Sequence, residues 1–176
     1  SYLEQAHHLT KMEAAKVVSA MFLGWAVGAP LSGYWSDRTG RRTRPLVLGA
    51  FCALLCIAAV LYVPHLSYTS LLVLLFLYGV FSGTEIIVFV MAKERSGAEL
   101  SGTVFAAVNM IVTLGAVIFQ PLVGFLLDYS TTQAESAGAM MYHISDYQRA
   151  LLVLPLSLVL VMVIGFFLKD PEPEKS

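Results

Sequence analysis

Long stretches of hydrophobic residues alternate with short polar segments along the whole chain. Because an α-helix rises about 1.5 Å per residue, roughly 20 apolar residues are needed to cross the ~30 Å hydrocarbon layer of a membrane. Five stretches are long enough, and they run approximately over residues 14–34, 45–63, 70–92, 103–127 and 150–168. They are too long for strands of a soluble sheet and lack the short alternating segments of a membrane barrel. The pattern predicts an all-α integral membrane protein with five transmembrane helices.

The ends of these stretches carry helix-start signals. Thr10 and Glu13 fit a capping box, and so do Ser145 and Gln148. Pro45 suits the first position of a helix because the N–H that it lacks has no partner there. Pro155 frees the carbonyl of the residue four positions earlier, and it therefore predicts a bend, as do Pro30 and Pro121 in their own helices.

Basic residues are distributed unevenly between the two ends of the predicted helices. Cytoplasmic loops of membrane proteins carry an excess of Lys and Arg. If the loop after the first span is cytoplasmic, eight basic residues lie on that side: Arg38, Arg41, Arg42, Arg44, Lys93, Arg95, Lys169 and Lys175. Only Lys11, Lys16 and Arg149 lie on the other side. We therefore expect a cytoplasmic C-terminus.

Composition agrees with a membrane protein and narrows the possible partners. Hydrophobic residues make up 57% of the 176 residues and charged residues 13%, about half the charged share of a soluble domain. The net charge of −1 and the scattered basic residues argue against a nucleic-acid partner. Cys52 and Cys56 lie four positions apart in one apolar run, which favours packing over a disulfide or metal site.

The loop after the first span reads GYWSDRTGRR, residues 33–42. Gly33 is expected to let two helices approach closely, and Gly40 to permit a tight turn. Asp37 is placed to pair with Arg38, with Arg41 or with the N-terminus of a neighbouring helix. A generic positive-inside turn would explain the arginines, but not the glycines and the aspartate at these spacings.

This loop resembles the signature loop of the major facilitator superfamily, whose pattern is matched by Gly33, Asp37, Arg38, Gly40, Arg41 and Arg42. We call residues 33–42 the signature loop. The resemblance implies that the chain is a fragment of a C-terminal half, namely helices eight to twelve and the end of helix seven. Residues 1–13 are then an extracytoplasmic segment, residues 14–168 a five-helix bundle and residues 169–176 a cytoplasmic tail.

Glu85 is the only ionisable residue clearly inside a predicted span. A carboxylate in hydrocarbon costs several kcal/mol unless it is paired, protonated or hydrated. Tyr78, Ser82, Glu85 and Phe89 recur at helical spacing and therefore share one face. The resemblance implies that this span lines a central cavity, so Glu85 is a candidate for proton coupling or substrate binding. A structural ion pair and snorkelling to the interface are the alternatives.

The fourth span repeats this pattern with Asn109, Thr113 and Gln120 on one face. Together with Tyr78, Ser82 and Glu85, these residues form the predicted substrate- and proton-binding set. The alternative is that the amides hydrogen-bond between helices.

For several other polar or small residues, the sequence pattern favours a structural role. Gly24, Gly28 and Ser32 form a small-xxx-small pattern, which is typical of closely packed membrane helices. His7 and His8 are expected in a solvated outer loop.

The resemblance implies a secondary active transporter that moves a small solute by alternating access, with protons as the expected coupling ion in symport. Expected partners are the missing N-terminal half, the lipid bilayer, the solute and protons; no cofactor or metal is expected. An enzyme is disfavoured because the chain has no G-x-S-x-G elbow and no His inside any span. A non-transporting membrane module or assembly subunit is the alternative. Short loops favour a bacterial inner membrane.

Overall fold

Five long apolar helices dominate the computed structural model, which describes residues 2–96, 99–131, 143–168 and 170. Every regular element in these residues is helical, and the five-helix all-α prediction is confirmed. The elements are α1 (Tyr2–His7), α2 (Lys11–Thr39), α3 (Thr43–Tyr62), α4 (Tyr68–Ser82), η1 (Gly83–Glu85), α5 (Ile86–Ser96), α6 (Ser101–Thr131), α7 (Ile144–Leu151) and α8 (Val153–Phe167). The candidate spans are α2, α3, Tyr68–Ser96, Ser101–Leu127 and Ile144–Phe167.

Helices α2 and α4 pack with their backbones in direct contact. A Cβ atom added at Gly28 would collide with the backbone of Val80, and one added at Gly79 would collide with the backbone of Met21. Gly24, Gly28 and Ser32 are all buried. The predicted small-residue seam is therefore confirmed, and it is completed by Gly79 on α4.

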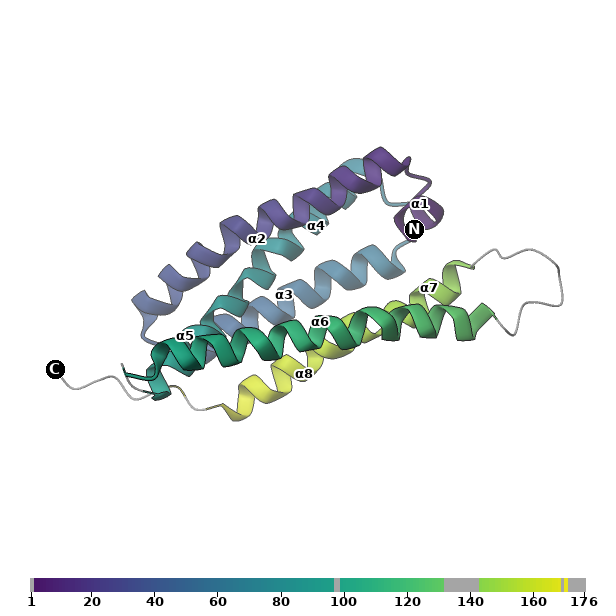
Figure 1. The fold of residues 1–176 in the computed structure, drawn as a ribbon. Coiled ribbons are helices and arrows are strands. Elements are labelled where there is room, and N and C mark those ends of the chain that lie inside the picture. Colours follow the sequence, from purple (N-terminus) through teal and green to yellow (C-terminus); the bar gives the residue numbers. More distant parts are fainter. Residues whose placement is uncertain (1, 97–98, 132–142, 169, 171–176) are drawn as a thin grey trace.

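The C-terminal end of α3 is bound by side chains from α1 and α7. The Tyr2 hydroxyl donates to the Leu61 carbonyl at 2.7 Å, and the Gln148 amide donates to the same carbonyl at 2.6 Å. His7 Nε2 lies 3.2 Å from the Val60 carbonyl oxygen. The expectation of a solvated His7 is wrong, because this residue is buried, with 8% of its surface exposed, against the last turn of α3. These contacts fasten α1 and α7 to the same end of α3 (Figure 1).

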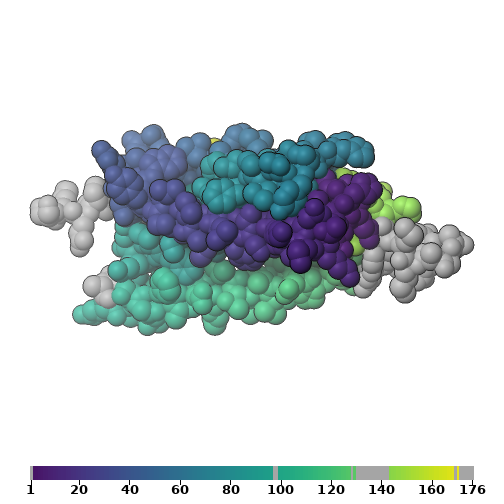
Figure 2. All heavy atoms as spheres, turned by 90° about the horizontal axis from the view of Figure 1, so that it is seen from above, coloured from purple at the N-terminus to yellow at the C-terminus, as the bar shows by residue number. Residues whose placement is uncertain are grey.

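Helix α6 lies along one side of the molecule and has no buried residue in its membrane span. Figure 2 shows it as a row beside the layer formed by α2 and α4. It contacts α5 and α7. Large apolar side chains on it remain uncovered by the described chain, among them Ile111, Ile118 and Phe125.

Two spans are interrupted. The third span contains the 3₁₀ turn η1 between α4 and α5, a break that the hydrophobic pattern does not predict. The fifth span is interrupted at Leu152, between α7 and α8, which agrees with the bend expected from Pro155. The fifth span also starts earlier than expected, because His143 rather than Ser145 is the residue that caps α7. The capping box of Thr10 and Glu13 is present as expected.

Candidate functional site

The signature loop makes a tight turn at Gly40. This residue has a left-handed backbone with φ of 61°, and its N–H donates to the Asp37 carbonyl at 3.4 Å. Because a left-handed backbone favours glycine, the turn predicted at Gly40 is confirmed. The role expected for Gly33 is wrong within the described chain, since a Cβ atom there would meet nothing within 4 Å. Close approach of helices occurs instead at Gly24, Gly28 and Gly79.

Arg42 is the central residue of a charged network at this turn. Its guanidinium forms ion pairs with Asp37 of the same loop and with Glu94 near the end of α5. It also donates to the buried Ser36 hydroxyl at 3.0 Å. Hydrogen bonding to Glu94, opposed by burial and assisted by Asp37, raises the pKa of Arg42 above its ordinary value. The guanidinium is therefore a permanent positive charge that joins two helix ends.

Asp37 pairs with Arg42, and not with Arg38 or Arg41 as the spacing suggested. Arg38 instead donates to the Tyr34 hydroxyl at 2.7 Å, one helical turn earlier. The reason is the turn at Gly40, which reverses the chain direction and brings Arg42 back towards the end of α2. A helical register alone does not reveal this return.

Asp170, which follows α8, caps the start of α3. Its carboxylate accepts from the N–H of Arg42 at 2.9 Å, and from the N–H and hydroxyl of Thr43 at 2.8 and 2.9 Å. Arg42, the residue before the first residue of α3, makes no side-chain hydrogen bond that caps this helix. Burial pushes the pKa of Asp170 upward, but the hydrogen bonds from Thr43 and Arg42 and the charge of Arg41 outweigh it and hold the pKa below its ordinary value.

The network therefore brings three segments to one end of the bundle: the signature loop, the end of α5 and the segment after α8 (Figure 1). The sequence pattern does not reveal that Arg42 and the start of α3 have Ser36, Glu94 and Asp170 as partners. The available signal was the presence of acidic residues directly after the third and fifth spans, on the side where the basic residues gather.

Glu85 lies in η1, at the break of the third span. The span Tyr68–Ser96 has 29 residues, so Glu85 is about 5 Å from its midpoint along the axis. Its side chain is exposed and makes no hydrogen bond or ion pair with the described residues. Ser82 Oγ is buried and has no hydrogen-bond partner there. Tyr78 lies near enough to both to interact electrostatically, and it also packs against the cores around Leu71 and Leu61.

The polar stripe of α6 stands apart from this group. Asn109, Thr113 and Gln120 are exposed, and the Thr113 hydroxyl donates to the backbone carbonyl of Asn109 at 2.8 Å. The contact between the third and fourth spans is aromatic, with the rings of Phe89 and Phe105 4.8 Å apart. Tyr78 thus lies within electrostatic reach of Ser82 and Glu85, and no hydrogen bond among the described residues joins these three to the stripe of α6.

Apolar helices of spanning length, joined by a charged network at one end, define a multi-pass α-helical membrane protein. The family model of the Major Facilitator Superfamily matches residues 1–176, and the chain belongs to this superfamily. Members of the superfamily are transporters rather than enzymes. Comparisons with curated proteins and with solved structures gave no match.

Proposed function

We propose that the chain is the C-terminal part of a secondary active transporter, which moves a small solute by alternating access and couples this movement to protons through Glu85. The observation that carries the proposal is the position of this carboxylate, near the middle of a span and without a partner in the described chain. A charged side chain at that depth costs about 2.5–3.5 kcal/mol on insertion scales. Such a cost is offset where the group faces a water-filled path or exchanges a proton.

The break at η1 supports this assignment. A 3₁₀ turn inside a long helix often marks a functional hinge, and interrupted helices in transporters place polar groups at substrate and ion sites. Tyr78 and Ser82 precede the break on the same face, and the Ser82 hydroxyl has no hydrogen-bond partner of standard geometry among the described residues. We assign these two residues to solute binding beside Glu85.

We assign Asn109, Thr113 and Gln120 of α6 to the opposite wall of the same cavity. The support is that no residue of α6 is buried along its whole span. This is expected of a helix that faces a water-filled cavity with one side and the N-terminal half of a transporter with another. The N-terminal half is accordingly the proposed partner of α6. In this arrangement residues 1–13 are extracytoplasmic and residues 169–176 form a cytoplasmic tail, in a bacterial inner membrane.

The network around Arg42 suits a cytoplasmic gate. It ties the ends of α2 and α5 to the start of α3 through charges that water can reach, so its opening and closing can follow the movement of the helices. The coupling between such a contact and transport is typically about 1–3 kcal/mol.

The test is solute uptake into liposomes that contain the whole transporter, over a panel of amino acids, sugars, organic acids and organic cations. Each solute is measured with an imposed pH gradient and with the gradient collapsed by a protonophore. Gradient-dependent accumulation of one class supports the proposal. Uptake that equilibrates without responding to the gradient contradicts proton coupling, and the absence of uptake for every solute favours a non-transporting module.

A further inference from the structure

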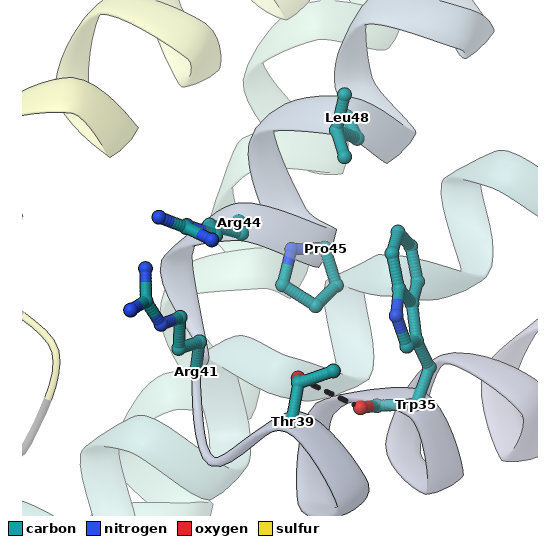
Figure 3. A pocket seen from close by; sticks show the side chains of 6 residues that line it. All are labelled: Trp35, Thr39, Arg41, Arg44, Pro45 and Leu48. Carbon is teal, nitrogen blue, oxygen red and sulfur yellow. Dashed lines mark hydrogen bonds between the residues drawn. The ribbon is translucent and has the colours of Figure 1, made fainter.

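An open cavity of about 440 Å³ lies between the end of α2 and the first turns of α3. Figure 3 shows that Arg41 and Arg44 extend in the same direction on one side of Pro45, while the Trp35 indole lies on the other side. Leu48, one turn further along α3, completes the apolar wall. The cavity is therefore cationic at one edge and apolar at the other.

The charges of this cavity are available for a ligand. Of the four arginines around the turn, Arg38 is engaged by Tyr34, and Arg42 by Asp37 and Glu94. The side chains of Arg41 and Arg44 are exposed and form no ion pair or hydrogen bond with the part of the chain that the structure describes. Arg41 acts on Asp170 only through its charge. None of the described residues that line the cavity is acidic.

An uncovered apolar stripe continues from the cavity into the membrane span. Leu48, Phe51 and Leu55 follow Arg44 at helical spacing and share its face of α3, with 49%, 44% and 55% of their surfaces exposed. Helix α3 packs with its other faces against α4 and α8. From Arg44 to Leu55 the helix rises about 16 Å, roughly half the hydrocarbon thickness and thus the depth of one leaflet.

We propose that this cavity binds an anionic phospholipid, with the phosphate held by Arg41 and Arg44 and an acyl chain along Leu48, Phe51 and Leu55. Guanidinium groups suit phosphate oxygens because they can donate in a bidentate fork. Trp35 stands at the end of its span, where amphipathic rings favour the headgroup level. The charge and the stripe together distinguish a lipid from an entirely apolar partner helix, which would leave two arginines uncompensated.

The test measures lipid binding to the whole transporter by native mass spectrometry, titrating phosphatidylglycerol and, separately, phosphatidylcholine. Phosphatidylglycerol should bind more tightly. The double variant Arg41→Gln/Arg44→Gln should bind it about 30-fold more weakly, and Arg41→Lys/Arg44→Lys, which keeps the charges but not the bidentate fork, should bind it with intermediate affinity. The matched control Lys11→Gln/Lys16→Gln removes two exposed charges at the opposite end of α2 and should leave the affinity unchanged.

Two further arms separate a lipid from other occupants. Leu48→Asn should weaken phosphatidylglycerol binding, and inorganic phosphate should not displace the lipid at matched concentration. Equal affinity for the two lipids, or wild-type affinity in the Arg41→Gln/Arg44→Gln variant, overturns the proposal. Displacement by inorganic phosphate with no effect of Leu48→Asn also overturns it, in favour of a site for a soluble anion. Because the readout is binding, failure here leaves the proposed transport function untouched.

Discussion

The Asp170 carboxylate accepts a hydrogen bond from the Thr43 N–H at 2.8 Å, which joins residues 127 positions apart in the sequence. A helix N-terminus carries unpaired N–H groups and a partial positive charge. The Asp170 carboxylate accepts from these N–H groups and places a negative charge beside the partial positive charge. It belongs to a segment outside α3, the helix that it caps. The start of α3 and the segment after α8 are therefore parts of one structural unit at the signature-loop end.

Removing this cap should destabilise the unit. Asp170→Ala deletes the acceptor for the N–H groups of Arg42 and Thr43, and loss of an N-cap typically costs about 0.5–2 kcal/mol. Hydrogen exchange at these two amides should accelerate by the corresponding factor. Glu99→Ala removes an acidic charge from the turn after α5 and serves as the control. Equal protection of the amides in both variants would show that the cap carries no stability.

The same contact should depend on pH only in acid. The pKa of Asp170 is held below its ordinary value, which is about 3.9 for aspartate. A carboxylate with a lowered pKa stabilises the folded state above its unfolded pKa, and this contribution is lost as the pH falls through the folded pKa. Protection of the Thr43 amide, corrected for intrinsic exchange, should be constant from pH 7 to about pH 4 and fall below that. A loss between pH 7 and pH 5 would point to another group.

The two ion pairs of Arg42 should differ in strength. The Glu94 side chain is 33% exposed and that of Asp37 is 69% exposed, so solvent screens the pair with Asp37 more. Glu94→Gln should therefore impair transport more than Asp37→Asn, although both should reach the membrane at wild-type levels. Uptake at matched expression gives the ranking, and a double-mutant cycle with Arg42→Gln gives the coupling. Wild-type uptake in both variants would remove the gate role of the network.

Gly79 in the third span and Gly33 in the first span should respond differently to substitution by alanine. In Gly79→Ala the new Cβ meets the backbone of Met21, which cannot rotate away, and overpacking of this kind costs about 1–3 kcal/mol. Gly33→Ala adds the same group where nothing lies within 4 Å, and alanine favours a helix over glycine. Thermal unfolding in detergent should show a lower transition temperature for Gly79→Ala and no decrease for Gly33→Ala. Equal effects would contradict the backbone contact between α2 and α4.

The number of spans and the packing of Gly24 and Gly28 could be predicted because both depend on local pattern. Hydrophobic length determines which segments span, and small residues at every fourth position form one face of a helix. The partner of Asp37 could not be predicted in this way, because it depends on the chain reversal at Gly40. The burial of His7 likewise depends on the last turn of α3, more than 50 residues away.

The candidate site shows the same division. Helical spacing groups Tyr78, Ser82 and Glu85 because all three come from one continuous stretch, and Tyr78 lies within electrostatic reach of the other two. Their role as a binding set stays a prediction. Helical spacing alone does not predict the 3₁₀ turn at Glu85, although the turn begins at the Ser82-Gly83 pair, a combination that often interrupts a helix. Whether Asn109 and Gln120 face the same cavity depends on how α6 meets a partner, which periodicity within one helix cannot specify.

Glu85 is the residue on which proton coupling depends in the proposed function. The variant Glu85→Gln keeps the shape and hydrogen-bonding capacity of a protonated carboxyl group but cannot release a proton. It should therefore lose accumulation driven by a pH gradient and retain exchange of labelled for unlabelled solute, which needs no net proton movement. Glu99→Gln, an equivalent change outside the spans, should keep both activities.

Each outcome of this experiment assigns a different role to the carboxylate. Loss of both accumulation and solute binding would indicate direct recognition of the solute by Glu85. Loss of folded protein would indicate an ion pair with a residue outside the described chain, since no such pair exists within it. Accumulation at the wild-type level in Glu85→Gln would exclude coupling through this residue. The carboxylate would still lie about 5 Å from the middle of a span, where inserting a charge costs free energy. The next hypothesis is then that ordered water along η1 solvates Glu85 and offsets this cost.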